Sequence, residues 1–190
     1  MKIGLFFGSF NPVHIGHLAI ANYMAEFTDL QQVWFVISPQ NPLKRSSTLL
    51  EDHKRRTVLE IAIEDDSRFR ICDVEFRLPK PSYTIDTLIH LKELYPLHEF
   101  VLIMGSDGLS SFYKWKNHTV IENNYDRYVY PRPGFEVDAS GYHRTRLVDA
   151  PLMEISSTFI RNAIREKRDI RHFLPPGVFN YVTEMHLYEK

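Results

Sequence analysis

The sequence is poor in cysteine: Cys72 is the only one among 190 residues. A single thiol cannot close a disulfide within the chain, and it cannot build a zinc site from thiolates. Because no paired histidine is evident nearby, we interpret Cys72 as a small apolar side chain rather than a nucleophile. The cysteine usage favours a reducing compartment, and we expect a cytoplasmic protein.

Long apolar runs and an excess of charge of one sign are also missing. The first apolar run, residues 3–7, is too short for a signal-peptide core, and no later run approaches membrane-spanning length. The net charge is −1, so no overall field attracts nucleic acid or an anionic membrane. We therefore expect no nucleic-acid and no membrane partner, and any anionic ligand has to be recognised by local groups.

The sequence contains no low-complexity tract and no internal repeat, while hydrophobic residues make up 44% and charged residues 25% of it. This composition excludes disordered, collagen-like and solenoid proteins. A length of 190 residues allows one well-buried core. We expect a single domain spanning residues 1–190. A homo-oligomer is compatible with the sequence, which does not decide the oligomeric state.

Short apolar runs alternate with segments of helical spacing. The apolar runs, typical of strands covered on both faces, are residues 3–7, 33–37, 100–104 and 128–130. The segments with helical spacing are residues 18–27, 56–63 and 85–94. This alternation predicts βαβ units with right-handed crossovers. The fold class is therefore α/β with a doubly wound, mostly parallel sheet and ligands at the carboxyl ends of its strands.

The remaining segments carry weaker signals. Residues 106–124 and 131–143 are predicted as loops, which either hold substrate or simply connect elements at the surface. A Pro-Pro-Gly break at residues 175–177 precedes a segment of helical spacing at residues 178–187, which we interpret as a structural helix. The chain should therefore carry a small C-terminal helical part.

The first candidate site lies between the first predicted strand and the first predicted helix, at residues 8–17. A glycine-bearing turn from strand to helix directs backbone N–H groups and the positive end of the helix dipole at whatever lies above it, which suits phosphate. His14 and His17 are three residues apart, so near the helix start they can face the same way. We interpret this pair of histidines as functional.

Other interpretations of this stretch need to be weighed. A Walker loop requires a lysine after its last glycine and a dinucleotide fingerprint requires three spaced glycines, and neither pattern is present. A metal site would need a third ligand besides His14 and His17, and the sequence does not name one. We therefore predict no metal held by protein ligands alone. The remaining alternative is structural, with one histidine capping the helix and the other at the surface.

The second candidate site is a hydroxyl-rich helix start at residues 155–161. Ser156, Ser157 and Thr158 are ordinary capping residues, so the hydroxyls alone prove little. Arg161 is unusual because the helix dipole disfavours a cation near the first turn. A bound polyanion would remove that conflict, since a guanidinium offers a planar fork of donors to phosphate oxygens. The alternative is an exposed arginine on an ordinarily capped helix.

With both motifs identified, the chain resembles the nucleotidyltransferase superfamily that carries a histidine-x-glycine-histidine element and a serine-rich, arginine-bearing helix start. Within it, the bacterial nicotinate mononucleotide adenylyltransferases are the most similar group. The matching segments are residues 8–17, 41–44, 82–87, 104–107, 114–115, 132–134 and 155–161. The chain departs from the family at Phe7, Gly8 and Ser9, where two glycines and a threonine are common, and at Asn11, where aspartate is common.

The resemblance implies a Rossmann-like nucleotidyltransferase fold and transfer of AMP from ATP to nicotinate mononucleotide. It implies catalytic roles for His14, His17, Lys44 and Arg161. It implies that ATP and its phosphates are bound by Gly8, Ser9, Phe10, Gly16, Gly105, Asp107, Ser156, Ser157 and Thr158. It implies that the acceptor is bound by Tyr83, Thr84, Trp115 and Arg132. For two of these the alternatives are structural: Trp115 as a half-buried loop anchor rather than a lid on the pyridine ring, and Thr84 as an N-cap rather than a neighbour of the carboxylate.

The chemistry of the acceptor fits this site. A phosphate monoester has its second pKa near about 6 and is largely anionic at neutral pH, so the reaction needs no general base. It needs positioning and stabilisation of charge instead. We expect Mg²⁺ to arrive with ATP and to keep most of its waters.

Three rival functions fit the same motifs. Pantetheine-phosphate adenylyltransferases share the first and last motifs but usually lack the segments at residues 83–87 and 114–115, and cytidylyl transfer uses the same fold. The alternative outside enzymology is a nucleotide-sensing module that kept the pocket and lost the chemistry.

Overall fold

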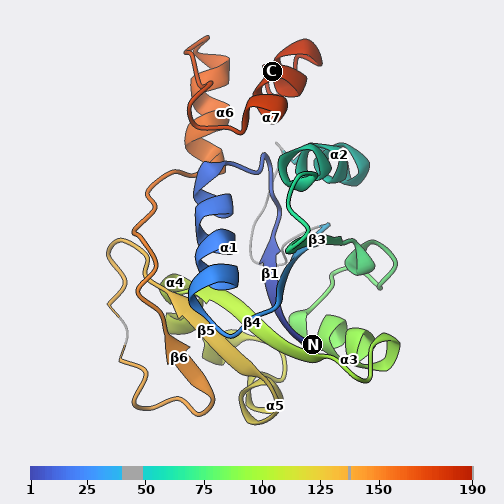
Figure 1. Cartoon of the computed structure of the whole chain (residues 1–190), viewed down its shortest axis with the longest axis vertical. Coiled ribbons are helices and arrows are strands. Elements are labelled where there is room, and N and C mark those ends of the chain that lie inside the picture. The colour runs from blue at the N-terminus through green and yellow to red at the C-terminus, as the bar shows by residue number, and fades with distance from the viewer. Residues whose placement is uncertain (40–48, 137, 190) are drawn as a thin grey trace.

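The computed structural model describes residues 1–39, 49–136 and 138–189. Within them, one sheet of parallel strands forms the centre of the molecule (Figure 1), in the order β3-β2-β1-β4-β5-β6. The strands are β1 (Lys2–Gly8), β2 (Gln32–Ile37), β3 (Phe69–Cys72), β4 (Glu99–Gly105), β5 (Asp126–Tyr130) and β6 (Thr145–Leu147). The predicted doubly wound α/β class is confirmed, with every pair of neighbouring strands parallel.

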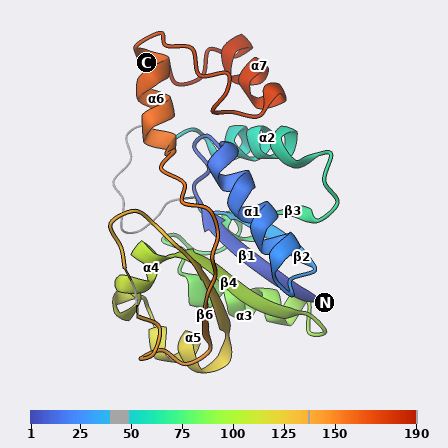
Figure 2. The same cartoon turned by 60° about the vertical axis from the view of Figure 1, so that its left-hand side comes forward.

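Helices fill the connections between the strands up to β5, and two more helices follow β6. The longer ones are α1 (Ile15–Phe27), α2 (Asp52–Ile63), α3 (Thr84–Leu94), α6 (Ser157–Arg165) and α7 (Pro176–Glu184). The short ones are η1 (Val74–Phe76), α4 (Ser106–Ser110), η2 (Phe112–Lys114) and α5 (His118–Asn124). Helices α6 and α7 extend beyond one end of the sheet together with α2 (Figure 2), which gives the chain its small C-terminal helical part.

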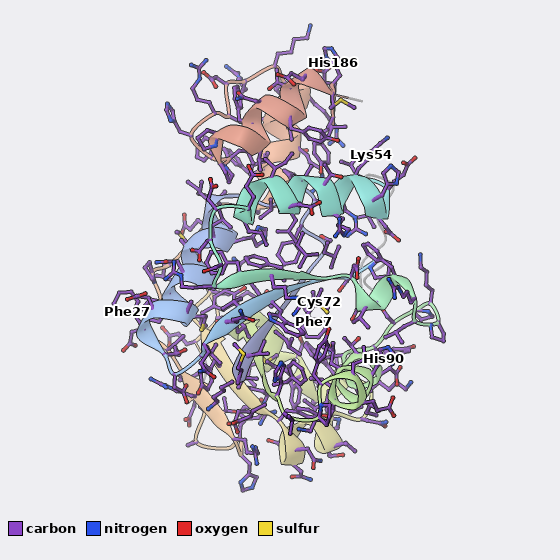
Figure 3. All side chains as sticks on the ribbon, turned by 45° about the vertical axis from the view of Figure 1, so that its right-hand side comes forward. Phe7, Phe27, Lys54, Cys72, His90 and His186 are labelled. Carbon is purple, nitrogen blue, oxygen red and sulfur yellow. The ribbon has the colours of Figure 1, made fainter. Side chains whose placement is uncertain are left out.

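Alternate residues of the central strands point to opposite faces of the sheet, as the period of a strand requires. Phe6 and Ile103 join a buried cluster with α1, α2, α6 and α7. Leu5 joins a second cluster with α3, α4 and α5. Figure 3 shows Lys54 of α2 and His90 of α3 on opposite sides of the sheet. Both faces are therefore covered, which explains the nearly continuous apolar runs of these strands.

The strand order reverses between β1 and β4. Strand β1 pairs with β2 on one side and with β4 on the other, so the chain winds outward to β3 and then crosses back to β4. The carboxyl ends of the two strands are Gly8 and Gly105. Ligands of open α/β sheets bind beside such a reversal because the loops on its two sides diverge and leave a crevice. Segments 8–17 and 104–107 are thereby placed together.

Two strands and three short helices depart from the sequence-based expectation. Strand β3 has only four residues with a polar one inside, and β6 has only three with both Arg146 and Leu147 exposed, so neither shows an apolar run. Residues 106–124, predicted as a loop, contain α4, η2 and α5. The longest of these has 7 residues, which is too short for apolar residues to show a helical period. Residues 131–143 lie between β5 and β6 and carry no named element among those described.

None of the helices in the described ranges is both long enough and apolar enough to cross a membrane.

Candidate active site

The loop after β1 is shaped by the packing of Phe10. This residue has a positive φ of 44°, and its side chain is 1% exposed. Its ring lies against Phe6, Phe35 and His17, with centroids 5.1 to 5.9 Å apart. A Cβ on Gly8 would lie only 2.8 Å from the Phe10 ring, so glycine is required there. Phe10 can therefore offer a nucleotide only its backbone.

His14 and His17 form one unit at the start of α1. His14 is the N-cap of the helix, and its backbone N–H donates to Nδ1 of His17 at 3.3 Å. The two imidazole rings stack, with centroids 3.7 Å apart and an angle of 26° between their planes. Because Nδ1 of His17 accepts a hydrogen bond, the proton of the neutral ring sits on Nε2. His17 is therefore both a capping residue and a hydrogen-bond donor.

The histidine pair is kept neutral by its surroundings. Burial lowers the pKa of His14 to about 4, and the positive charge of Arg132 acts in the same direction. Burial also lowers the pKa of His17 well below its usual value, helped by His14 and Arg132. Both rings are thus uncharged at neutral pH, and they can stabilise developing negative charge only through N–H groups, which need no reorganisation during a reaction. Nδ1 of His14 is buried and has no hydrogen-bond partner among the described residues.

Gly16 makes room for this arrangement. A Cβ at residue 16 would lie 3.0 Å from Nδ1 and 3.2 Å from Cε1 of His14, and 3.7 Å from Ile155. The His14 ring therefore rests on the bare backbone of α1. Ile155 opens the second motif, so the two motifs already touch here.

Hydrogen bonds join the start of α6 directly to the first loop. The Ser157 hydroxyl donates to the backbone oxygen of Pro12 at 2.9 Å. The Arg161 guanidinium donates through Nη1 to the backbone oxygen of Asn11 at 2.7 Å and through Nη2 to the Thr158 hydroxyl at 3.2 Å. The starts of α1 and α6 thus lie side by side (Figure 1), although 140 residues or so separate them in sequence.

This geometry revises the interpretation of the second motif. Ser156 is the N-cap of α6 and accepts the Phe159 N–H at 3.2 Å, as its residue type predicts. Arg161 is the fifth helical residue, and the acceptors that satisfy its Nη groups belong to the protein. The helix-dipole conflict alone therefore does not require a polyanion. What the arginine does in the structure is to tie α6 to the loop that precedes the histidines.

Arg55, to which the sequence analysis gave no role, is a second arginine that holds the loop after β1. Its side chain is fully buried and donates to the backbone oxygens of Ser9 at 2.7 Å, Ser38 at 2.9 Å and Leu50 at 3.0 Å. It also pairs with Asp52 at 2.6 Å. The signal that could have revealed it is its position on the apolar face of α2, which presents Arg55 together with buried apolar residues three and four positions later.

Arg132 enters the site from the other side of the strand reversal. Its backbone N–H donates to the Ser106 hydroxyl at 2.9 Å, and its Nε lies 3.9 Å from the Asp107 carboxylate. A Cβ on Gly105 would lie 2.8 Å from Cγ of Arg132, so the absence of a side chain there admits the arginine. The charge of Arg132 contributes to the lowered pKa of both His14 and His17, so Arg132 lies near the histidines.

Of the four predicted acceptor residues, all but Arg132 belong to the start of α3 or to the segment that reaches it. Tyr83 is its N-cap residue and Thr84 its first helical residue. Lys116 reaches this helix start from the segment after η2: its Nζ lies 3.0 Å from the Asp86 carboxylate and 4.6 Å from the centre of the Tyr83 ring. Trp115 immediately precedes Lys116, so Trp115 lies in the segment that reaches the start of α3.

A buried carboxylate holds this helix start in place. Glu75 of η1 is 3% exposed and accepts hydrogen bonds from the hydroxyls of Ser82 at 2.9 Å and Thr87 at 2.7 Å. Trp115 is half-buried, with its ring 5.5 Å from that of Phe112. Trp115 is therefore packed into the fold, while the residue as a whole remains partly exposed.

Two further predictions concern the catalytic role of Lys44 and the ligands of a metal ion. Lys44 lies outside the described residues, so its predicted catalytic role has no structural account. Among the described residues, no three His, Cys, Asp or Glu side chains come together as metal ligands.

The fold and the site define a class of protein. A family model described as cytidylyltransferase-like matches residues 5–163. The chain belongs to this family.

Relatives of known name extend over the whole chain. It is 52% identical to a probable nicotinate-nucleotide adenylyltransferase of Flavobacterium johnsoniae, with 100% of both chains covered. It is 50% identical to a protein of the same name from Cytophaga hutchinsonii, over 99% of this chain and 98% of the other. The corresponding Bacteroides thetaiotaomicron protein is 51% identical, over 97% and 92%.

Solved structures share the fold at lower identity. The nicotinic acid mononucleotide adenylyltransferase of Plasmodium falciparum, complexed with NaAD, superposes with a TM-score of 0.83 at 22% identity, covering 99% of this chain and 97% of the other. A putative nicotinate-nucleotide adenylyltransferase from Vibrio parahaemolyticus gives a TM-score of 0.75 at 22% identity, covering 100% and 96%. The Rossmann-like nucleotidyltransferase fold expected from the resemblance is thus confirmed.

Proposed function

We propose that the chain transfers the adenylyl group of ATP to the phosphate of nicotinate mononucleotide, producing deamido-NAD and pyrophosphate in NAD biosynthesis. The observation that carries this proposal is the meeting of the starts of α1 and α6 over the loop after β1, at the point where the strand order reverses. Relatives at about half identity that bear the nicotinate-nucleotide adenylyltransferase name support the choice of acceptor.

In the proposed reaction an oxygen of the acceptor phosphate attacks the α-phosphorus of ATP. The bond from that phosphorus to the bridging oxygen of the β-phosphate breaks, and pyrophosphate leaves with the electron pair. The acceptor oxygen is already anionic at neutral pH, so no side chain has to remove a proton. The two buried, neutral histidines suit this chemistry because neither can serve as a cationic acid at neutral pH and His17 presents an N–H.

The side chains divide the negative charge between them. The His17 Nε2–H, with His14 beside it, contacts an oxygen on the α-phosphorus as charge builds there. Arg132, which lies near the histidines, adds a positive charge at the same place, so we assign it to the phosphates as well as to the acceptor. Arg161 and the backbone N–H of Ser157 hold the departing pyrophosphate from the α6 side, since the Ser157 hydroxyl already donates to Pro12. Lys44 completes the set by the matching motif at residues 41–44.

The acceptor lies at the start of α3 in this proposal. Thr84 and the backbone N–H groups of the helix start attract the nicotinate carboxylate, since the positive end of a helix favours an anion. The Trp115 indole covers the pyridine ring. Comparing nicotinate with nicotinamide mononucleotide tests this: we expect a clear preference for nicotinate, and equal rates would contradict the carboxylate assignment.

Mg²⁺ fits the proposal as part of MgATP. The described residues offer isolated carboxylates such as Asp107 rather than a set of converging ones, so phosphate oxygens and water would provide most of its ligands. When bound, the ion neutralises part of the charge on the phosphates. A single domain spanning residues 1–190, a cytoplasmic location and a possible homo-oligomer remain parts of the proposal.

A substrate panel tests the function. The protein is incubated with ATP, Mg²⁺ and, in turn, nicotinate mononucleotide, nicotinamide mononucleotide and phosphopantetheine, and pyrophosphate and dinucleotide products are measured. Product with the first alone supports the proposal. Product mainly with phosphopantetheine would reassign the acceptor, and ATP binding without pyrophosphate release from any acceptor would indicate a nucleotide-sensing module instead.

A further inference from the structure

The tail that follows α7 places a tyrosine deep in the molecule. Tyr188 is 7% exposed and belongs to the buried cluster that contains α2, α6 and α7. Its position is fixed by the turn that ends the helix, in which the Leu187 N–H donates to the backbone oxygen of Val182 at 3.0 Å. The Tyr188 hydroxyl is buried without a hydrogen-bond partner among the described residues. A buried hydroxyl in that state is rare and calls for an explanation.

A second buried polar group without a partner lies on Arg161. Its Nη1 and Nη2 donate to Asn11 and Thr158, while its Nε is buried and has no hydrogen-bond partner among the described residues. The guanidinium carries donors only, and a phenol oxygen can accept. One group therefore has a hydrogen to give and the other has lone pairs to receive it.

The two groups are close enough to act on each other. Burial raises the pKa of Tyr188, and the charges of Arg161 and Arg55 oppose that rise. Burial lowers the pKa of Arg161, while Tyr188 acts in the opposite direction and the charge of Arg165 in the same one. Arg161 and Arg55 are the two arginines that hold the backbone of the first loop, at Asn11 and Ser9. Tyr188 is thus near enough to feel the charge of both arginines that hold this loop.

We infer that Tyr188 is a positioning residue of the active site, whose hydroxyl accepts the Arg161 Nε–H through one bridging water molecule, since neither buried atom has a direct partner among the described residues. This contact holds the Nε side of the guanidinium, whose Nη1 and Nη2 are already held by Asn11 and Thr158. The Nη hydrogens that are not used in these bonds then keep their direction towards the pyrophosphate. The role of Arg161 at the pyrophosphate belongs to the proposed function, and the inference rests on it. The C-terminal tail is then part of the machinery that binds the leaving group.

The first test removes the hydroxyl and keeps the ring. We expect Tyr188→Phe to lower kcat/KM for ATP and to weaken the binding of inorganic pyrophosphate by about tenfold each, the usual effect of losing a hydrogen bond to a charged group. The KM for nicotinate mononucleotide should not change. Tyr181→Phe, in the half-buried tyrosine of the neighbouring α7, is the matched control and should behave as the wild type.

A double-mutant cycle separates positioning from general stabilisation. If Tyr188 acts through Arg161, Tyr188→Phe adds no further loss when Arg161 is already alanine. An equal loss in both backgrounds would overturn the inference, and so would a Tyr188→Phe variant with wild-type pyrophosphate affinity. Arg161→Ala with unchanged pyrophosphate affinity would refute the role of the arginine and the inference with it. If the wild type forms no dinucleotide, the proposed function fails, and the pyrophosphate arm still decides the inference.

A measurement on the wild type does not depend on any tyrosine variant folding. The Arg161 Nε–H signal is identified in the NMR spectrum by its loss in Arg161→Lys. We expect this hydrogen to exchange slowly with water, because it is buried and bonded. Rapid exchange, like that of an exposed arginine such as Arg168, would contradict the contact.

Discussion

The imidazole rings of His14 and His17 stack with centroids 3.7 Å apart, and the backbone N–H of the first donates to Nδ1 of the second. One contact thus caps α1 and fixes the His17 tautomer with its proton on Nε2. The same ring makes the capping interaction and carries the proposed catalytic N–H. The structural and functional interpretations of the histidine pair are therefore compatible rather than exclusive.

Replacing His17 by alanine should abolish most of the activity. The variant loses the proposed donor to the oxygen on the α-phosphorus, and the loss of one such donor commonly lowers the rate by about a hundredfold or more. Pyrophosphate release under saturating substrates measures the effect, and circular dichroism checks the fold. His172→Ala, in the loop between α6 and α7, is the control. Near-normal turnover of a folded His17→Ala protein would refute the catalytic role.

The buried histidines should make the protein less stable in acid. The unfolded chain binds a proton at His14 near pH 6.5 and the folded chain only near pH 4, so between these values the unfolded state binds more protons. The free energy of unfolding therefore falls as the pH falls through this window, by up to about 1.4 kcal/mol per pH unit for His14.

Urea unfolding across the window measures this slope. His14→Gln should reduce it, because the titrating group is gone, while His17 and carboxyl groups such as Asp66, whose pKa values are also lowered, continue to contribute. His53→Gln, in a side chain that is 73% exposed, is the control and should leave the slope as it is. A slope unaffected by the His14 substitution would show that this ring is not held neutral by burial.

Adding a methyl group at Gly16 should damage catalysis more than stability. The new Cβ would lie 3.0 Å from Nδ1 of His14, so the ring has to shift by a few tenths of an ångström. Alanine is otherwise the better residue within a helix. We expect kcat to fall about tenfold through misplacement of the histidine pair. Gly141→Ala, where a Cβ meets nothing within 4 Å, should have no effect. Full activity of Gly16→Ala would mean that the His14 position is not critical.

Replacing Arg55 by methionine should destabilise the whole site. The change removes a buried guanidinium and leaves the Asp52 carboxylate and backbone oxygens of three segments without their donor. We expect the free energy of unfolding to fall by about 3 kcal/mol. Arg56→Met tests the same change one residue later, in a side chain that is 42% exposed, and should cost less than about 1 kcal/mol. Chemical unfolding of both variants measures the difference. Equal stabilities would contradict the claim that the buried hydrogen bonds of Arg55 hold the loop after β1 in place.

Glu75 should influence the acceptor and not ATP. In Glu75→Gln one of the two carboxylate oxygens that receive Ser82 and Thr87 becomes an NH₂ group, which cannot accept their hydrogens. The start of α3 is then held less firmly, and we expect the KM for nicotinate mononucleotide to rise several-fold while the KM for ATP stays constant. Glu93→Gln, exposed on the same helix, is the control. A parallel rise in both KM values would indicate a general loss of structure.

Local patterns were sufficient for much of the fold. The apolar runs that became β1, β2, β4 and β5 are buried on both faces, so their composition alone identifies them as central strands. Strands β3 and β6 lie at the two edges of the sheet and are short and partly exposed, so the same signal is missing there. The short helices between β4 and β5 were not predicted for a related reason: one or two turns are too short to show a helical period of apolar residues.

The sequence by itself determined the two motifs, because a strand-to-helix turn with glycines and a hydroxyl-rich helix start are local features with local physical causes. Only the tertiary structure decided what they share. It brought Arg161 to Asn11, 150 residues away in sequence, and Arg55 to Ser9, 46 residues away. It also placed Tyr188 near both arginines. Such contacts follow from how α2, α6 and α7 pack over the end of the sheet, and no local pattern encodes that packing.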